Sequence, residues 1–438
     1  MPLLKVVSGQ KPREIAVRVL NRPQTGEFIE NLLDRALASA RLSPEDRGLC
    51  HELVYGVVRW QATLDWLISR KTAGRKQKPV LEILLRLGLY QIFWLDRIPD
   101  HAAVNETVEL ARQFGFARES GFVNALLRGY LRECEATEAA LEALKNSDPA
   151  TAYSHPEWLV TRWRQRFGND QAAQLMAWNN EPAETFARVN TIKTDAGKLI
   201  EQWRDEGVDY DFIQRDWLAE NVFFKLKKHP PLASLPSFKH GFFYVQDPGT
   251  LLAPNKLKCQ TGQRILDLCA APGGKVSYLA QQLQNEAAIV AHDLSDERLQ
   301  WVQENCQRLG VTCVELATAS SPLLHSTQFY DRVLVDAPCS NSGVMRRRID
   351  LRWRIRPEEI QRLQAGQLDL LRRGAAFLKP GSLLVYSTCS LEPEENEEVV
   401  DKFITENPTH ELLESRTLLP FKDKVDGAFV ATIVKPGA

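Results

Sequence analysis

The fold is decided by Arg264-Ile-Leu-Asp-Leu-Cys-Ala-Ala-Pro-Gly-Gly-Lys275, a short apolar run that leads into a turn of small residues. Similar apolar runs follow at 288–293, 331–336 and 382–387, and helical patterns at 275–283, 296–309 and 357–378 separate them. Strand–helix alternation of this kind predicts a doubly wound parallel sheet, which the run at 427–434 would close. In such a sheet, ligands bind beyond the carboxyl ends of the strands.

The turn at 267–275 is the first candidate ligand site. Small side chains let the backbone approach a ligand closely, and N–H groups at a helix start suit a carboxylate. A phosphate-binding loop needs G-x-x-x-x-G-K-[ST], and Cys269 and Val276 break that pattern. A tight turn with no ligand is the competing interpretation. Asp293 ends the next apolar run, where an acid accepts hydrogen bonds from ribose hydroxyls or instead caps a helix.

The N-terminal third has a different pattern. Leu81, Leu84, Leu85 and Leu89 recur at helical spacing, and Pro99 interrupts that helix. A compact helical bundle fits residues 13 to about 145, and short strand-like runs around one helical run indicate a small α/β insert after it. The expected domains are 1–145 (helical), 150–246 (small α/β) and 247–438 (parallel sheet).

Composition sets only broad limits on function. The 438 residues carry a net charge of -1, so a nucleic-acid partner would have to meet local basic patches. The eight cysteines form no CxxC pair, and no metal site is expected. Neither the start of the chain nor the apolar region 80–95 resembles a signal peptide or a membrane span. We therefore expect a cytoplasmic protein, without membrane contact, whose cysteines are free thiols.

Two cysteines lie just beyond expected strand ends, within Asp336-Ala-Pro-Cys339 and Ser387-Thr-Cys-Ser390, and both can reach one pocket. A single free cysteine is usually a small buried hydrophobe, but two beside an aspartate favour a reactive site. A basic segment containing Trp353 follows, which suits a phosphate backbone and a stacked base, or else is a solvated surface. The acidic run 394–398 is expected at a helix N-terminus.

Three segments together resemble the Sun/Nop family of RNA cytosine-5 methyltransferases: LDLCAAPGGK at 266–275, VDAPCSNSG at 335–343, and YSTCS with PEEN at 386–396. Near the N-terminus, the segments at 88–91, 98–103 and 122–128 resemble a NusB-like RNA-binding domain. The pairing of the two is similar to the RsmB type of the family, which methylates small-subunit ribosomal RNA.

The resemblance implies a Rossmann-like methyltransferase domain that uses S-adenosylmethionine, an all-α NusB-like domain before it, and the small α/β insert between them. The expected partner is RNA, in particular 16S ribosomal RNA, and a monomer is expected. Cys389 would be the nucleophile, and Cys339 would assist product release. Expected cofactor contacts are Cys269, Ala270, Ala271, Pro272, Gly273, Gly274, Lys275, Asp293 and Asp336. Expected substrate contacts are Arg346, Arg347 and Arg352.

The chemistry explains why two cysteines and an acid are needed. Carbon 5 of cytosine is too weakly nucleophilic to attack a methyl sulfonium, but a thiolate added at carbon 6 gives an enamine-like intermediate that can. Asp336 would protonate or hydrogen-bond N3. One departure from the family lies at Leu316–Ser320, which lacks the acid expected near the adenine. A catalytically weak RNA-binding or assembly factor is therefore an alternative function for the chain. A small-molecule or protein methyltransferase is a third hypothesis.

Overall fold

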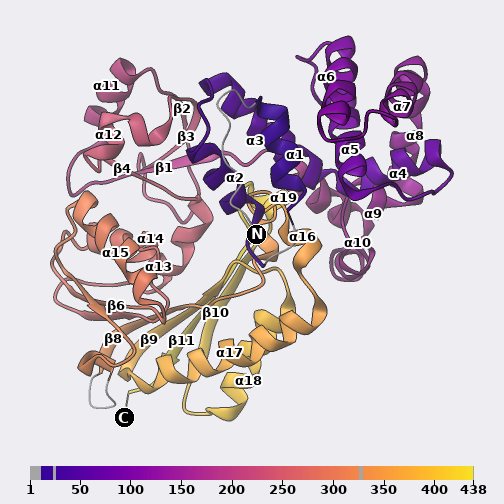
Figure 1. Ribbon diagram of the computed structural model, residues 1–438. Helices are drawn as coiled ribbons and strands as arrows, with labels where there is room; N and C mark the ends of the chain where they lie inside the picture. Colours follow the sequence, from indigo (N-terminus) through magenta and orange to yellow (C-terminus); the bar gives the residue numbers. More distant parts are fainter. Residues whose placement is uncertain (1–10, 23–25, 325–328, 438) are drawn as a thin grey trace. The chain divides into compact units, whose positions relative to one another are not determined.

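The computed structural model describes residues 11–22, 26–324 and 329–437 (Figure 1). The first ten residues, which bear on the expected lack of a signal peptide, lie outside these ranges. The chain forms two compact units. One comprises the residues up to Glu181 together with Met345–Arg354, and the other comprises Pro182–Val344 together with the residues from Ile355 onward. Within the described ranges, no helix has both the length and the apolar character needed to cross a bilayer.

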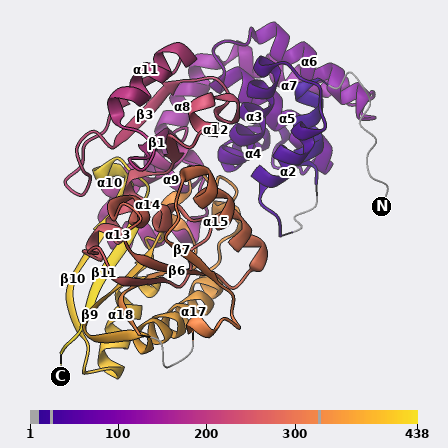
Figure 2. The ribbon, with the colours of Figure 1, turned by 90° about the vertical axis from the view of Figure 1, so that its left-hand side faces the viewer.

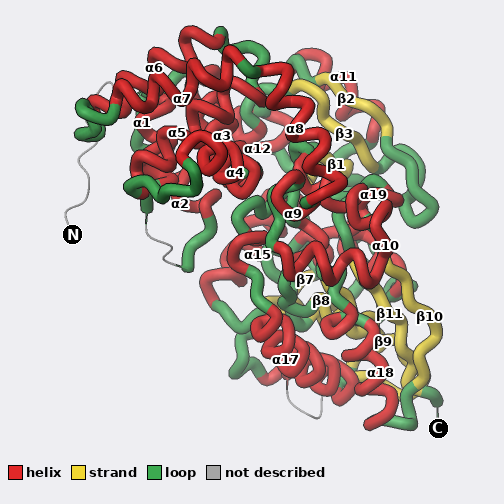
Figure 3. The backbone as a smooth tube through the Cα atoms, turned by 90° about the vertical axis from the view of Figure 1, so that its right-hand side faces the viewer, coloured by secondary structure: helices red, strands yellow, loops and turns green. Residues whose placement is uncertain are grey.

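Helices build the first unit, as the red tube in Figure 3 shows. Leu81, Leu84 and Leu85 point into its core with at most 2% of their surface exposed, which confirms the helical spacing seen in the sequence. Pro99 precedes a new helix, as expected. The helices are α1 (Pro12–Leu20), α2 (Ile29–Ala38), α3 (Pro44–Arg59), α4 (Gln61–Thr72), α5 (Pro79–Trp94), α6 (Asp100–Gln113), α7 (Ser120–Arg132), α8 (Cys134–Ser147), α9 (Pro149–Ala152), α10 (Glu157–Asn180) and α16 (Leu351–Arg354).

The segment 345–354 joins this helical unit from far along the chain. Ile349 is buried in the core of the helical unit. The indole of Trp353 donates to the carbonyl of Val58 at 2.9 Å, and the carboxylate of Asp350 accepts from the backbone N–H of Ile29 at 3.0 Å. The sequence did not indicate this insertion, and the division into domains at 145, 150 and 246 stays a prediction.

The second unit begins with a small antiparallel sheet of strand order β2-β3-β1-β4. Trp203, Phe224 and Phe243 fill its core. The side chain of Asp195 caps the helix of this insert by accepting from the N–H of Lys198 at 2.9 Å. Its elements are β1 (Thr185–Val189), α11 (Ala196–Glu206), β2 (Asp209–Phe212), β3 (Phe223–Lys228), α12 (Pro236–Lys239) and β4 (Phe243–Val245).

A seven-stranded sheet follows, with strand order β10-β11-β9-β8-β5-β6-β7. Five strands pair in parallel, and β11 and β10 close one edge in antiparallel fashion. The elements are α13 (Leu252–Lys256), β5 (Arg264–Asp267), α14 (Gly274–Gln282), β6 (Ala288–His292), α15 (Asp296–Leu309), β7 (Val314–Ala317), β8 (Tyr330–Asp336), α17 (Pro357–Ala376), β9 (Leu378–Thr388), α18 (Glu397–Glu406), β10 (Glu411–Leu418), α19 (Pro420–Asp423) and β11 (Ala428–Lys435).

Helices cover both faces of this sheet (Figures 1 and 2). Ile265 packs on one face with apolar residues of α14 and α15, while its neighbour Leu266 packs on the other face with α17 and α18. Successive side chains of a strand point to opposite faces, so a strand covered on both sides is apolar throughout. The doubly wound α/β fold expected from the sequence is therefore confirmed.

Candidate active site at the carboxyl ends of the central strands

The chain order reverses between β5 and β8, which lie side by side at the centre of the sheet. From β5 the chain continues to β6 and β7 on one side, and β8 then starts the other half. The register pairs Asp267 with Leu334 and Asp336 with Ser387, so the polar ends of three strands emerge at one edge. Ligands bind at such a switch point in open α/β sheets.

The turn of small residues between β5 and α14 has a backbone conformation that favours glycine. Gly273 has a φ of +100°, which favours glycine, and it lies directly before the first residue of α14. A Cβ atom on Gly274 would lie 3.1 Å from the ring of Tyr244. The turn is therefore closely packed from behind, and a side chain at 274 would have to displace the ring of Tyr244.

Arg188, on β1, supports this turn and was not singled out from the sequence. Its fully buried guanidinium donates to the carbonyl of Gly274 at 3.0 Å and to the hydroxyl of Ser277 at 2.9 Å. It also contacts the rings of Tyr244 and Tyr278. The small insert thus holds the start of α14 in place.

Asp267 presents a buried carboxylate at the end of β5. One oxygen accepts from the N–H of Cys269 at 3.1 Å, whereas Oδ2 is buried and has no hydrogen-bond partner among the residues that the structure describes. Burial, with the charge of Asp336, raises the pKa of Asp267 to about 7. A buried oxygen without a protein donor suits a ligand that brings its own donor, such as the ammonium group of an amino-acid moiety.

Asp293 lies at the end of β6 and is 3% exposed. It accepts from the N–H of Ala271 at 3.4 Å and from the guanidinium of Arg298 at 3.1 Å. The hydroxyl of Ser295, not Asp293, caps α15. The parallel register pairs His292 with Ala317, so Thr318 follows β7 at the level of Asp293.

The two cysteines meet at the ends of β8 and β9. Their Sγ atoms are 3.2 Å apart, and both are free thiols with partly exposed side chains. Asn341 links the two loops, because its amide oxygen lies 3.0 Å from the sulfur of Cys389 and its nitrogen donates to the carbonyl of Cys339 at 2.8 Å. The hydrogen bond with Cys389, together with burial, raises the pKa of Cys339 well above its usual value.

Asp336 lies beside the cysteine pair and is held by two groups. The ammonium of Lys275 forms an ion pair with Oδ2, and the hydroxyl of Ser387 donates to Oδ1 at 2.7 Å. Although burial opposes it, the charge of Asp336 and its hydrogen bond raise the pKa of Lys275. The side chain of Asp336 remains 31% exposed, so it can also reach a bound molecule.

Two of the three expected substrate arginines are buried in the structure. Arg352 is fully buried in the helical unit, where its guanidinium donates to the carbonyls of Arg59, Ser154 and Asn179 and to the side chain of Asn180, at 2.7–3.3 Å. Arg346 is 2% exposed and lies 4.0 Å from the ring centre of Trp178. A buried guanidinium does not reach an RNA phosphate, so both anchor the segment 345–354. Arg347 is partly exposed and stays a predicted contact.

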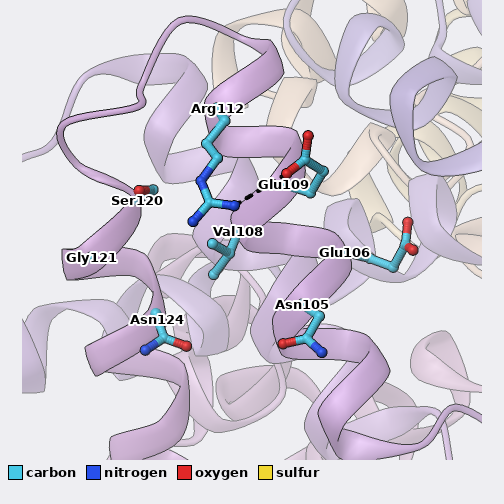
Figure 4. Close-up of a pocket in the computed structure, with 8 residues that line it drawn as sticks. All are labelled: Asn105, Glu106, Val108, Glu109, Arg112, Ser120, Gly121 and Asn124. Atoms are coloured by element: carbon cyan, nitrogen blue, oxygen red, sulfur yellow. Dashed lines mark hydrogen bonds and ion pairs between the residues drawn. The ribbon is translucent and has the colours of Figure 1, made fainter.

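The helical unit has a hollow of its own between α6 and α7, with a volume of about 530 Å³ (Figure 4). The guanidinium of Arg112, at its rim, is paired with Glu109 at 3.3 Å. Polar groups of both signs line the hollow, and it contains no cysteine. It offers no arrangement comparable to the paired thiols.

Comparison with known proteins agrees with this architecture. The family described as 16S rRNA methyltransferase RsmB/F matches residues 254–434, the NusB family matches 10–132, and the ferredoxin-like domain of RsmF/B-like methyltransferases matches 155–217. The crystal structure of PH0851 shares the fold, with a TM-score of 0.75 and 23% identity, over 97% of this chain and all of that chain.

Two relatives match along nearly their whole length. A probable ribosomal RNA small subunit methyltransferase B of Bacillus subtilis is 34% identical, over 97% of this chain and 99% of the relative. The ribosomal RNA small subunit methyltransferase B of Vibrio vulnificus is 35% identical, over 92% of this chain and 95% of the relative. This chain therefore belongs to the ribosomal RNA small subunit methyltransferase B family.

Proposed function

We propose that the chain transfers a methyl group from S-adenosylmethionine to carbon 5 of a cytosine in 16S ribosomal RNA, through a covalent bond between Cys389 and carbon 6. The observation that carries this proposal is the pair of sulfur atoms 3.2 Å apart, beside Asp336 and at the ligand-binding edge of the sheet. The names of the full-length relatives support ribosomal RNA as the substrate.

The residues at this edge fit the cofactor. The turn from Cys269 to Lys275 would surround its methionine part, and the unpartnered oxygen of Asp267 would accept from its ammonium group. Asp293 would bind the ribose hydroxyls. When bound, S-adenosylmethionine supplies an electrophilic methyl group. Lys275 and Asp336 would border both the cofactor and the base.

The chain's own groups divide the reaction into easier steps. The thiolate of Cys389 adds to carbon 6, and the negative charge that builds toward N3 is met by a proton or hydrogen bond from the Lys275–Asp336 pair. Methylation of carbon 5 would leave the spent cofactor as a neutral thioether. Water then takes the carbon 5 proton, N3 returns its proton to the Lys275–Asp336 pair, and the bond between Cys389 and carbon 6 breaks to release the thiolate. The thiol of Cys339, 3.2 Å away, would hydrogen-bond the departing sulfur and so assist release.

The helical unit would dock the RNA. Exposed basic residues gather at the end of α4 and in the loop before α5: Arg70, Lys71, Arg75, Lys76 and Lys78. Lysine and arginine at such a site bind phosphates without reading sequence. The target cytosine would then be turned out of its stack to reach the cysteines. A monomeric state and a cytoplasmic location stay predictions.

Bisulfite sequencing of 16S ribosomal RNA from cells with and without the chain tests the reaction and its position. We expect one or more cytosines to lose protection when the chain is absent. With purified protein, Cys389→Ala should abolish methyl transfer, and Cys339→Ala should accumulate a covalent enzyme–RNA adduct on denaturing gels. Cys134→Ala, in the helical unit, is the matched control. Normal turnover by Cys389→Ala would rule out the proposed nucleophile.

Thr318 motivates one alternative, a catalytically weak RNA-binding or assembly factor that kept the fold. Where the family has an acid near the adenine, this chain has an exposed hydroxyl 3.3 Å from that of Ser320. Calorimetric titration with S-adenosylmethionine separates the two functions. An absence of binding at millimolar ligand would favour the assembly factor.

A further inference from the structure

Glu395 is a fully buried carboxylate behind the two cysteines. Its Oε1 accepts from the N–H of Ser340 at 2.8 Å and from the side-chain amide of Gln367 at 3.0 Å. Its Oε2 accepts from the hydroxyls of Ser340 and Ser390, each at 2.5 Å. All four donors are neutral groups, so the charge of this carboxylate is stabilised by hydrogen bonds.

Two of these donors come from the loops that carry the cysteines. Ser340 directly follows Cys339, and Ser390 directly follows Cys389, so one carboxylate binds the two cysteine loops together. Gln367, on α17, also donates to the carbonyl of Pro338 at 2.9 Å, which ties the first loop to a long helix. The hydroxyl of Tyr386 donates to the backbone carbonyl of Glu395 at 2.6 Å and fixes the carboxylate's own backbone.

The charge of Glu395 also acts on the thiol of Cys339. After the hydrogen bond with Cys389, burial and the charge of Cys389, the negative charge of Glu395 is a further cause of the raised pKa of Cys339. Two sulfur atoms in contact titrate as a coupled pair. The sulfur of Cys389 also donates to the amide oxygen of Asn341 at 3.0 Å, so both thiols are held by hydrogen bonds between the two loops.

We propose that Glu395 is a positioning residue for methyl transfer: it clamps the two cysteine loops through Ser340 and Ser390 and so holds the two sulfur atoms in contact, with its own charge behind Cys339. This inference rests on the proposed function. It explains how thiols from two separate loops stay within 3.2 Å of each other. The residue touches neither base nor cofactor and acts through the two loops.

Glu395→Gln tests the charge while keeping the shape of the side chain. The readout is the pH dependence of alkylation by iodoacetamide, measured peptide by peptide with mass spectrometry on the full chain without RNA or cofactor. In Glu395→Gln, the midpoint for Cys339 should fall by about one pH unit, because a nearby negative charge is removed. The exposed Glu398→Gln is the control and should shift neither midpoint.

Ser390→Ala tests the clamp separately, because it leaves every charge in place while it removes the hydroxyl that donates to Glu395 and accepts from the N–H of Glu392. We expect kcat to fall by roughly ten- to thirtyfold, the value expected from two lost buried hydrogen bonds, with KM for RNA and both alkylation midpoints unchanged. Should Glu395→Gln fail to fold, the effect of Ser390→Ala on kcat alone decides the clamp.

Unchanged midpoints in folded Glu395→Gln, or an unchanged kcat in Ser390→Ala, would overturn the proposal. The alkylation assay uses the protein alone, so its failure would leave methylation of cytosine untouched. Conversely, full activity of Cys389→Ala would remove the proposed function while the alkylation result still stood. The two failures are therefore distinguishable.

Discussion

Lowering the pH from 8 to 6 should weaken the binding of S-adenosylmethionine about tenfold through Asp267. The unpartnered Oδ2 forms an ion pair with the ligand's ammonium when the carboxyl group is ionised, and the neutral carboxyl group binds it far more weakly. Burial and the charge of Asp336 raise the pKa of Asp267 to about 7, so at pH 6 roughly one-tenth of the molecules carry the binding form. A tenfold change in Kd corresponds to about 1.4 kcal/mol.

Isothermal titration calorimetry at both pH values measures this change. In buffers of different ionisation enthalpy, binding at pH 6 should release close to one proton, as linkage requires for a group of about that pKa. Asp267→Asn is the control: it should bind more weakly at pH 8 and should show only the small pH dependence of the ligand's own amino group. An affinity of the unsubstituted chain that is equal at pH 6 and pH 8 would refute the reasoning.

Ionisation of Asp267 favours ligand binding, but it destabilises the folded chain when no ligand is bound. Its pKa is raised in the folded chain, so its contribution to stability is fully present below its ordinary value of 3.8 and is lost as the pH rises toward about 7. Cofactor should therefore protect the chain against thermal unfolding more strongly at pH 8 than at pH 6. A scan with and without ligand at each pH measures this difference.

Three further outcomes are expected. Thr318→Asp should tighten binding of S-adenosylmethionine, by roughly tenfold for one hydrogen bond to a charged group, whereas Thr318→Asn should gain less; calorimetry compares them. Arg352→Ala should lower the free energy of unfolding of the helical unit by about 3–5 kcal/mol, because it empties a buried network of four acceptors, and denaturant titration followed by circular dichroism measures the loss. Gly343→Ala should lower kcat without changing cofactor affinity, because a Cβ there would lie 2.8 Å from the carbonyl oxygen of Cys389 and 2.7 Å from that of Gly427; an unchanged kcat would contradict this packing.

The strands and helices that pack on two sides were predictable from the sequence. The helix expected at 296–309 is α15 with the same bounds, and each of the apolar runs at 264–267, 288–293, 331–336, 382–387 and 427–434 forms a strand. Strands β2, β7 and β10 were missed. All three lie at sheet edges and have mostly exposed or half-exposed side chains, so none shows the apolar run of a strand covered on both faces.

The site was predictable as far as it follows from strand ends. The positions of Cys339 and Cys389 after neighbouring strands implied that they reach one pocket, and the structure brings their sulfur atoms together. Arg352 could not be distinguished from its exposed neighbours, because its acceptors lie 172 to 293 residues away along the chain. A local basic pattern looks the same whether the segment faces solvent or crosses into another unit.

The role of Glu395 was indicated in the sequence, but our interpretation of its acidic segment was incorrect. The acidic run 394–398 was expected to complement a helix dipole, but α18 begins at Glu397, so the dipole accounts for Glu397 and Glu398 and not for Glu395. A buried carboxylate must find donors, and the sequence places a serine directly after each cysteine, at 340 and at 390. A repeated Cys-Ser pair after two neighbouring strands therefore indicates a shared acceptor behind the thiols, and a nearby acid that the helix dipole does not need is the group to suspect.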